Sequence, residues 1–227
     1  MQMPIVKGRI AEVFDSLQGE GIYLGERQIF VRFFGCNLTC SFCDTHLSRF
    51  IEYEPKELLA EIKLYQGHSV ISFTGGEPLL QNDFLKSILK LTDKEGYKNY
   101  LETNGTLYNE LEEVIDYVDI VAMDLKLPSS TGLNNFWQQH RKFLKVASKK
   151  EMFLKIVICH STRQKDIMET LRLIKEINKR IILVLQPNGF EDYEMMRRKI
   201  ESFRNIARYN DITCCIIFQI HKKIGIR

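Results

Sequence analysis

Apolar runs of strand length alternate with longer amphipathic segments along almost the whole chain. In the longer segments the apolar residues recur at helical spacing, whereas the shorter runs are typical of buried strands. This alternation predicts βαβ units and a mainly parallel sheet. The units are too few for a complete eight-stranded barrel, so we expect an α/β fold in the form of an open, partial parallel β/α barrel. The expected strands are residues 9–14, 28–34, 69–73, 98–101, 119–123, 152–159, 181–185 and 212–218, and the expected helices are residues 55–65, 83–92, 109–117, 136–147, 164–177 and 193–209.

The composition is that of a single domain spanning residues 1–227. With 44% hydrophobic residues the chain can bury a sizeable core, and it shows neither a linker nor a low-complexity segment. The net charge of +3 and the pI of about 8.4 are too balanced to indicate nucleic-acid binding. No apolar run reaches the length of a membrane span, and the N-terminal residues lack a signal-peptide core. We therefore expect a cytoplasmic protein in a reducing compartment.

Three cysteines follow the expected strand at residues 28–34 in a CxxxCxxC pattern: Cys36, Cys40 and Cys43. Gly35 marks the end of that strand, so the cysteines fall on the loop at its carboxyl end. Three thiolates on one short loop can each bind one iron of a cubane iron–sulfur cluster. One iron of such a cubane is then left for a ligand that is not protein.

Other interpretations of the cysteines are open. The three clustered cysteines and His46 could form a Cys₃His zinc site, although structural zinc usually draws its ligands from two separated pairs, and the chain has no second CxxC. A disulfide framework is not expected in a long chain with six cysteines. Cys159 lies in an apolar strand, and the neighbours Cys214 and Cys215 would point to opposite faces of another. We expect these three to be small core residues.

Glycine and polar residues recur at the carboxyl ends of the expected strands. These ends line one mouth of a parallel barrel or open sheet, so we expect a single site there. Gly75 and Gly76 would let a ligand lie against bare backbone, and Glu77 adds a carboxylate that could pair an ammonium group. An ordinary β-to-α turn is the alternative for this loop. The segments concerned are residues 36–43, 74–78, 102–105, 124–126 and 186–189.

Two expected strands carry a cation within an apolar run. Arg32 lies in the strand before the cysteines, and Lys155 lies in residues 152–159. A cation in such a position needs an anionic partner or a path to solvent. An internal salt bridge and the carboxylate of a bound substrate are both open as the partner of Arg32.

These motifs together resemble those of the radical S-adenosylmethionine (SAM) superfamily, and more closely those of the 7-carboxy-7-deazaguanine synthases. The superfamily features are the CxxxCxxC loop and the Gly-Gly-Glu-Pro run at residues 75–78. The resemblance implies the partial barrel of radical SAM enzymes. The family features keep their order over nearly the whole chain, at residues 16–21, 32–38, 43–45, 74–78, 102–105, 124–126, 186–187 and 219–222.

The resemblance implies a [4Fe–4S] cluster on Cys36, Cys40 and Cys43, with SAM bound to the open iron. The cofactor would supply a 5′-deoxyadenosyl radical, so no side chain is expected to act as a catalytic group. The resemblance also implies Mg²⁺ with Thr45 as its protein ligand, although Asp44 is the stronger candidate on charge alone. The implied SAM-binding residues are Gly76, Glu77, Asp124, Leu125, Lys126, Gln186, Pro187, Asn188 and Gly189.

The resemblance implies a reaction as well. The substrate would be 6-carboxy-5,6,7,8-tetrahydropterin, which loses its C6 hydrogen, contracts its ring with loss of ammonia and yields 7-carboxy-7-deazaguanine for queuosine-type tRNA modification. Arg32 would bind the substrate carboxylate. The implied partners are a flavodoxin or ferredoxin reductant and a second copy in a homodimer, with no direct contact with nucleic acid or membrane. The implied substrate contacts are Leu17, Gln18, Gly19, Arg32, Thr74, His221 and Arg227.

Two alternative functions share part of the pattern. A glycyl-radical-enzyme activating enzyme has the same CxxxCxxC and Gly-Gly-Glu-Pro features, but it acts on a protein and would not need Gln18, Arg32 or His221. A structural metal-binding module, which is not an enzyme, would not require polar residues at the other strand ends.

Overall fold

One curved sheet runs through the structure, a computed structural model that describes residues 6–45, 47–177, 180–220 and 225. Its strands lie in the order β3-β1-β2-β4-β5-β6-β7-β8-β9. From β2 onward all neighbours are parallel, whereas β1 is antiparallel to both β2 and β3. The strands are β1 (Gly8–Leu17), β2 (Arg27–Phe33), β3 (Ile51–Tyr53), β4 (Val70–Gly75), β5 (Lys98–Thr103), β6 (Ile120–Asp124), β7 (Glu151–Ile158), β8 (Ile182–Pro187) and β9 (Cys214–Ile216).

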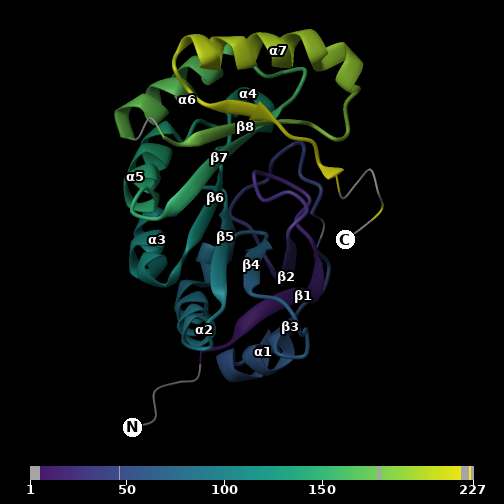
Figure 1. Cartoon of the computed structure of the whole chain (residues 1–227), viewed down its shortest axis with the longest axis vertical. Coiled ribbons are helices and arrows are strands. Elements are labelled where there is room, and N and C mark those ends of the chain that lie inside the picture. The colour runs from purple at the N-terminus through teal and green to yellow at the C-terminus, as the bar shows by residue number, and fades with distance from the viewer. Residues whose placement is uncertain (1–5, 46, 178–179, 221–224, 226–227) are drawn as a thin grey trace.

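Helices cover one side of this sheet, and the purple loops of the N-terminal part of the chain lie on the other (Figure 1). In the second helix Phe84, Leu85, Ile88 and Leu89 recur at helical spacing and are all buried, which explains why that face packs on the sheet. The helices are α1 (Pro55–Ile62), α2 (Asn82–Lys94), α3 (Tyr108–Val114), α4 (Pro128–Thr131), α5 (Trp137–Ala147), α6 (Gln164–Ile177) and α7 (Tyr193–Tyr209), with 3₁₀ helices η1 (Pro78–Gln81) and η2 (Ile115–Tyr117).

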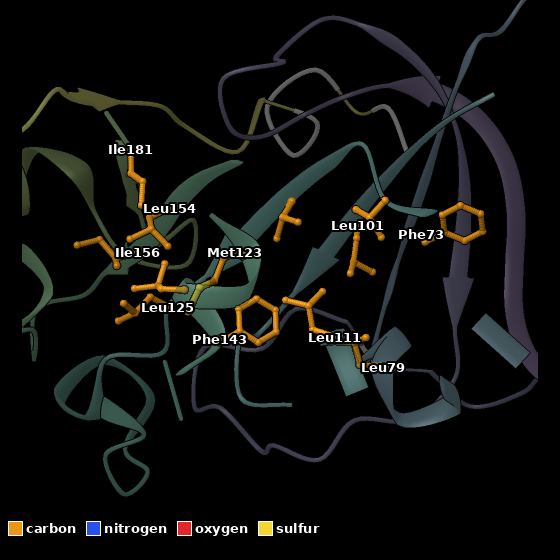
Figure 2. Close-up of a cluster of buried hydrophobic side chains, with 14 of the residues drawn as sticks. Phe73, Leu79, Leu101, Leu111, Met123, Leu125, Phe143, Leu154, Ile156 and Ile181 are labelled. Carbon is orange, nitrogen blue, oxygen red and sulfur yellow. The ribbon is translucent and has the colours of Figure 1, made fainter. Parts of the chain in front are cut away.

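The main hydrophobic core fills the space between the sheet and its helices (Figure 2). Leu101 of β5, Met123 of β6 and Leu154 of β7 come from successive strands and are fully buried. They belong to one cluster with Leu111 of α3 and Phe143 of α5. Burying apolar area of this kind is the dominant favourable contribution to folding, so this layer holds the strand ends in place.

The opposite face of the sheet carries a second, smaller apolar cluster. Tyr100, Ala122 and Phe153 alternate along their strands with residues of the main core, because successive strand residues face opposite sides. The same three residues line a cavity on this side of the sheet. The smaller cluster therefore forms the floor of that cavity.

The predicted open, partial barrel is confirmed. β3 and β9 have a neighbour on one side only, so the sheet does not close within the described residues. Both α6 and α7 begin and end at the predicted residues. Three short elements were not predicted: β3 has three residues, too few to show a period, α4 lies in a stretch expected to be loop, and η1 precedes the expected start of the second helix. Among the described helices, none is long and apolar enough to cross a membrane.

Of the three cysteines outside the CxxxCxxC loop, Cys159 is a core residue as predicted, and Cys214 and Cys215 are half-buried. Cys159 is buried directly after β7. In β9, Cys214 packs against the main core and Cys215 against the smaller cluster. The two neighbours therefore face opposite sides of the sheet and cannot converge on one metal ion.

Candidate active site

A cavity of about 540 Å³ lies at the carboxyl ends of the strands, on the face of the sheet that carries the smaller cluster. Residues that follow β1, β2, β4, β5, β6 and β8 all contribute to its wall. The strand ends therefore meet at one place, as predicted from their polar residues. The predicted site residues that line the cavity are Leu17, Gln18, Gly19, Arg32, Cys36, Cys40, Cys43, Thr45, Thr74, Gly76, Asp124, Lys126, Gln186 and Asn188.

Four other predicted residues do not line the cavity: Glu77, Leu125, Pro187 and Gly189. Leu125 packs in the main core, and Pro187 is buried at the end of β8. Gly189 lies in an exposed turn. Outside the described residues lie His46, His221 and Arg227.

Hydrogen bonds to α4 and to the loop after β5 hold the CxxxCxxC loop. The backbone N–H of Ser41 donates to the carbonyl of Thr131, and the Ser41 hydroxyl donates to the carbonyl of Ser130, both at 3.0 Å. Asn104 Nδ2, in the loop after β5, donates to Asn37 Oδ1 at 2.8 Å. The unpredicted α4 thus supplies two of the acceptors that position the cysteines.

The paired glycines after β4 bring this strand end against the cysteine loop. A Cβ atom on Gly76 would lie 1.8 Å from the carbonyl oxygen of Gly35, and Gly75 has a φ of +121°. The N–H of Gly76 donates to Phe33 O at 3.0 Å, and that of Glu77 donates to Gly35 O at 2.8 Å. Only glycine permits the backbone after β4 to come this close to the cysteine loop. The paired glycines therefore have a structural role that does not depend on a bound ligand.

Glu77 is buried beneath the cavity wall and does not face it. Its carboxylate accepts hydrogen bonds from the backbone N–H of Asn104 at 2.8 Å, the Thr103 hydroxyl at 2.9 Å and the backbone N–H of Leu79 at 3.2 Å. Burial raises the pKa of Glu77 to about 7, although these hydrogen bonds act in the opposite direction. The side chain of Glu77 therefore ties the end of β4 to the loop after β5, and its predicted contact with SAM stays a prediction.

Four charged side chains of alternating sign cross one wall of the cavity. Lys155 Nζ contacts the Glu20 carboxylate and lies 3.3 Å from Asp124 Oδ2, and Lys126 Nζ lies 2.9 Å from the same oxygen. Burial alone would raise the pKa of Asp124, but the two ammonium groups outweigh it and lower that pKa. Burial alone would lower the pKa of Lys155, but Glu20 and Asp124 raise it. Asp124 and Lys155 are therefore both charged at neutral pH.

Arg32 reaches the cavity from β2. Its Nε donates to Glu12 Oε2 at 3.2 Å, and its guanidinium carbon lies 5.5 Å from the centre of the Phe14 ring. Its two Nη atoms donate no hydrogen bond within the described part of the chain. Glu12 thus balances the charge of Arg32 and leaves the Nη donors available to a ligand.

Glu102 accepts three hydrogen bonds in the cavity wall, although no role was predicted for it. Gln18 Nε2 donates at 2.9 Å and the Ser72 hydroxyl at 3.1 Å to Oε1, and the Thr74 hydroxyl donates at 2.8 Å to Oε2. Gln18 and Thr74 belong to the predicted substrate contacts. Glu102 therefore holds two of these side chains in fixed positions.

Comparison with known proteins identifies the family. The family model of the Radical SAM superfamily matches residues 30–200. A 7-carboxy-7-deazaguanine synthase of Geobacter sulfurreducens is 39% identical over 202 residues, covering 78% of this chain and 80% of the relative. One of Archaeoglobus fulgidus is 32% identical over 244 residues, covering 98% of this chain and 100% of the relative. This chain belongs to the 7-carboxy-7-deazaguanine synthase family.

Solved structures share the fold. QueE from Escherichia coli has a TM-score of 0.64 and 23% identity and covers 92% of this chain and 93% of that chain. A domain of a pyruvate-formate lyase-activating enzyme from Bacteroides vulgatus has a TM-score of 0.53 and 18% identity, covering 66% of this chain and 99% of that chain. The fold is thus common to a deazaguanine synthase and an activating enzyme, and the sequence relationship assigns the chain to the synthases.

The synthase family, as part of the radical SAM superfamily, uses a [4Fe–4S] cluster and SAM, and the cysteine loop fits the cluster. The thiols of Cys36, Cys40 and Cys43 line one cavity. No three His, Cys, Asp or Glu side chains in the described part of the chain are placed to hold a single metal ion. Thiols that bind separate irons of a cubane do not need to converge in that way. The described residues of the loop thus fit a cluster.

Several polar residues of this synthase site had no predicted role. Gln219 Nε2 donates to Glu20 Oε1 at 2.7 Å and to Asp44 Oδ2 at 3.1 Å, which links three distant segments. Glu20, Glu102 and Gln219 lie in runs that carry the family resemblance, and Lys155 stood out as a cation in an apolar strand. These runs and the lysine in an apolar strand were the sequence features that could have indicated a role. The contacts that these residues make join positions far apart in the sequence.

Proposed function

We propose that this protein converts 6-carboxy-5,6,7,8-tetrahydropterin into 7-carboxy-7-deazaguanine with loss of ammonia, in queuosine-type biosynthesis. The observation that carries the proposal is one shared cavity. The three cysteines and the predicted pterin contacts Gln18 and Arg32 line it together. The related deazaguanine synthases support the same activity along nearly the whole chain.

The cofactor side of the cavity would hold the cluster on the three cysteines and SAM beside it. Bound together, the cluster and SAM supply radical abstraction of a substrate hydrogen. The side chains proposed to contact SAM are those of Asp124, Lys126, Gln186 and Asn188, with Gly76 offering its backbone. Asp124 Oδ1 and Gln186 Oε1 are buried and have no hydrogen-bond partner among the described residues, so they can accept from ammonium or hydroxyl donors. By contrast, Leu125, Pro187 and Gly189 would contribute backbone atoms only.

The substrate side would be organised around Arg32. Its Nη atoms can donate two parallel hydrogen bonds to a carboxylate, which orients the ligand as well as binding it. Gln18 and Thr74, fixed by Glu102, stand on the same cavity wall. Leu17 and Gly19 complete the proposed pterin contacts in the described residues. The apolar floor of Tyr100, Ala122 and Phe153 would exclude water beneath them.

We further propose Mg²⁺ near Thr45. Thr45 and Asp44 both line the cavity, and the Thr45 hydroxyl lies 3.3 Å from Asp44 Oδ1. Mg²⁺ prefers such hard oxygen donors and usually keeps several ligands from water or substrate. Thr45 is assigned as the protein ligand from the family resemblance, and Asp44 is the competing assignment.

The proposed partners follow from the chemistry and the family. A flavodoxin or ferredoxin would deliver the electron, and Cys36 and Cys43, which are exposed, lie where an electron donor can approach. We propose a homodimer and a single domain over residues 1–227, acting in the cytoplasm without contacting nucleic acid or membrane.

The proposed function is tested by anaerobic incubation of the reconstituted protein with 6-carboxytetrahydropterin, SAM, Mg²⁺ and dithionite, followed by mass spectrometry. We expect 7-carboxy-7-deazaguanine together with ammonia. Cys40→Ala should form neither product nor 5′-deoxyadenosine, whereas Cys159→Ala should match the parent. SAM cleavage without deazaguanine, combined with hydrogen abstraction from an added glycyl-radical enzyme, would contradict the proposal and favour an activating enzyme.

A further inference from the structure

Lys155 is a largely buried cation in β7, an inner strand of the sheet, and it lines the cavity. It lies in β7 on the same face as Phe153 and Val157, and all three line the cavity. Only 16% of its side chain is exposed. Burying an ammonium group is unfavourable unless it is paired with an anion, so the role of Lys155 follows from the carboxylates that it pairs with.

Lys155 joins two segments with different proposed tasks. Asp124, which lies opposite Lys155 in the β6–β7 pairing, belongs to the proposed cofactor side. Glu20 belongs to the loop after β1, where Leu17, Gln18 and Gly19 are the proposed pterin contacts. Lys155 is therefore the cation that links the substrate loop to the cofactor strand.

The substrate loop needs such an anchor because its backbone is intrinsically flexible. Gly19 and Gly21 flank Glu20, and glycine loses more conformational freedom on ordering than any other residue. Gly21 has a φ of +68° and lies so close to Phe153 that a Cβ atom would come within 2.4 Å of the ring. The Glu20 N–H also donates to Gln18 Oε1 at 3.1 Å. The backbone of Glu20 is thus hydrogen-bonded directly to the side chain of Gln18.

We propose that Lys155 is a positioning residue that holds the substrate loop, residues 17–21, in its pterin-binding conformation by pairing Glu20 with Asp124. The proposal rests on the proposed function, since the ligand concerned is the pterin. Lys155 acts through Glu20, and Lys126 pairs with the same oxygen of Asp124 that Lys155 contacts. Without Lys155, the largely buried carboxylates of Glu20 and Asp124 lose the cation that they share, and the loop is expected to move away.

A double-mutant cycle tests this assignment. Lys155→Met, Glu20→Gln and the double variant are compared with the parent by anaerobic calorimetric titration of 6-carboxytetrahydropterin into reconstituted protein. Lys150→Met is the matched control, because Lys150 directly precedes β7 and donates to Asp116 O at 3.0 Å on the surface. Lys155→Gln serves as a second variant if Lys155→Met does not fold.

We expect the Kd for the pterin to rise about tenfold or more in each single variant, the loss typical of a hydrogen bond to a charged group. The Kd of the double variant should not exceed that of the single variant that binds the pterin more weakly, because both changes remove the same contact. Additive losses would show that Lys155 acts independently of Glu20 and would overturn the proposal. A lowered unfolding midpoint with unchanged pterin Kd would also overturn it, since Lys155 would then be purely structural.

Hydrogen exchange gives a measurement that needs no ligand. Amides of residues 17–21 should exchange about tenfold faster or more in Lys155→Met and stay at the parent rate in Lys150→Met. Unchanged exchange in Lys155→Met overturns the positioning role. If the parent does not bind the pterin, the proposed function fails, and the exchange measurement still decides whether Lys155 orders the loop.

Discussion

From its sequence position, Arg32 could pair either with an internal carboxylate or with the carboxylate of a substrate, and its contacts allow both. It pairs with Glu12 through Nε, and its Nη atoms donate no hydrogen bond in the described part of the chain. An internal ion pair and a ligand carboxylate are therefore compatible. Glu12 partly compensates the charge of Arg32, while the Nη donors of its guanidinium stay available to a ligand.

Replacing Arg32 by lysine should separate these two roles. Arg32→Lys keeps a charge for Glu12 but cannot form two parallel hydrogen bonds with a carboxylate. We expect the KM for the pterin to rise about tenfold or more, with slow SAM cleavage that yields no product. Steady-state product assays beside assays of 5′-deoxyadenosine check this. Normal turnover by Arg32→Lys would mean that Arg32 serves the ion pair with Glu12 alone.

Two adjacent residues, Thr45 and Asp44, are candidates for the protein ligand of Mg²⁺, and Thr45 is the one proposed. Activity of the parent should rise with added Mg²⁺, and Thr45→Val should lose this response while keeping its iron content, because it removes the proposed oxygen ligand. Titration of Mg²⁺ in product assays provides the measurement. The assignment is wrong if Asp44→Asn abolishes the response and Thr45→Val retains it.

Glu77 predicts a pH dependence of stability. Its pKa rises from 4.5 to about 7 in the folded protein. The folded state therefore binds more protons than the unfolded state between these values, so the stability contributed by this group is greatest below the lower pKa and falls as pH rises to the upper one. The full change is roughly 3 kcal/mol, since each pKa unit corresponds to about 1.4 kcal/mol.

Glu77→Gln should remove this fall, because the amide does not ionise. Urea unfolding of the parent and of Glu77→Gln, compared at about pH 5 and about pH 7.5, measures the difference in the free energy of unfolding. The parent should lose stability relative to the variant as pH rises. A difference between the two proteins that is the same at both pH values would refute the shifted pKa.

At the scale of elements, the packing of β4 against the cysteine loop depends on Gly76. In Gly76→Ala the new Cβ would meet backbone atoms of Gly35, which cannot move aside as a side-chain tip can. We expect a large loss of iron on reconstitution and weaker SAM binding, because the loop that carries the thiols must shift. Iron analysis and SAM titration report both effects.

Gly96→Ala is the matched control for this change. Gly96 has a positive φ, but a Cβ atom added there would meet no other atom within 4 Å. Alanine at this position therefore adds backbone strain of about 1 kcal/mol without a clash. Its iron content should equal that of the parent. Equal iron content in Gly76→Ala as well would show that close approach of the two loops is not needed for the cluster.

Most elements could be predicted from the sequence because their apolar periodicity is strong. The helices α6 and α7 match their predicted bounds, and the sequence indicated the parallel order of the sheet through strand–helix alternation. Periodicity could not reveal β3 or α4, since each is too short to complete a repeat. Yet α4 supplies carbonyl acceptors to the cysteine loop, so a functional support was among the elements missed.

The site was predicted in part for a similar reason. Cys36, Cys40 and Cys43 are close in sequence, and their spacing was sufficient to indicate a cluster. The pairing of Lys155 with Glu20 joins residues 135 positions apart, and no local pattern predicts which carboxylate such a lysine meets. Glu77 makes contacts that its motif did not indicate, because its carboxylate ties the end of β4 to the loop after β5, and its role in SAM binding stays a prediction.

For the whole molecule, the sheet brings distant strand ends to one cavity, and each end contributes a different part of the proposed chemistry. The cysteine loop follows β2, the proposed SAM contacts follow β6 and β8, and the pterin loop follows β1. The central claim is that substrate and cofactor occupy this cavity together. Radical abstraction can then act directly on the bound pterin.

Transfer of deuterium from the substrate tests this claim most directly. The parent protein is incubated anaerobically with SAM, dithionite, Mg²⁺ and 6-carboxytetrahydropterin deuterated at C6, and the 5′-deoxyadenosine is analysed by mass spectrometry. We predict that 5′-deoxyadenosine carries the deuterium and that 7-carboxy-7-deazaguanine forms in step with it. Unlabelled 5′-deoxyadenosine in the incubation with deuterated pterin would contradict the account. The radical would then have taken its hydrogen from another source, because the cavity does not hold the pterin.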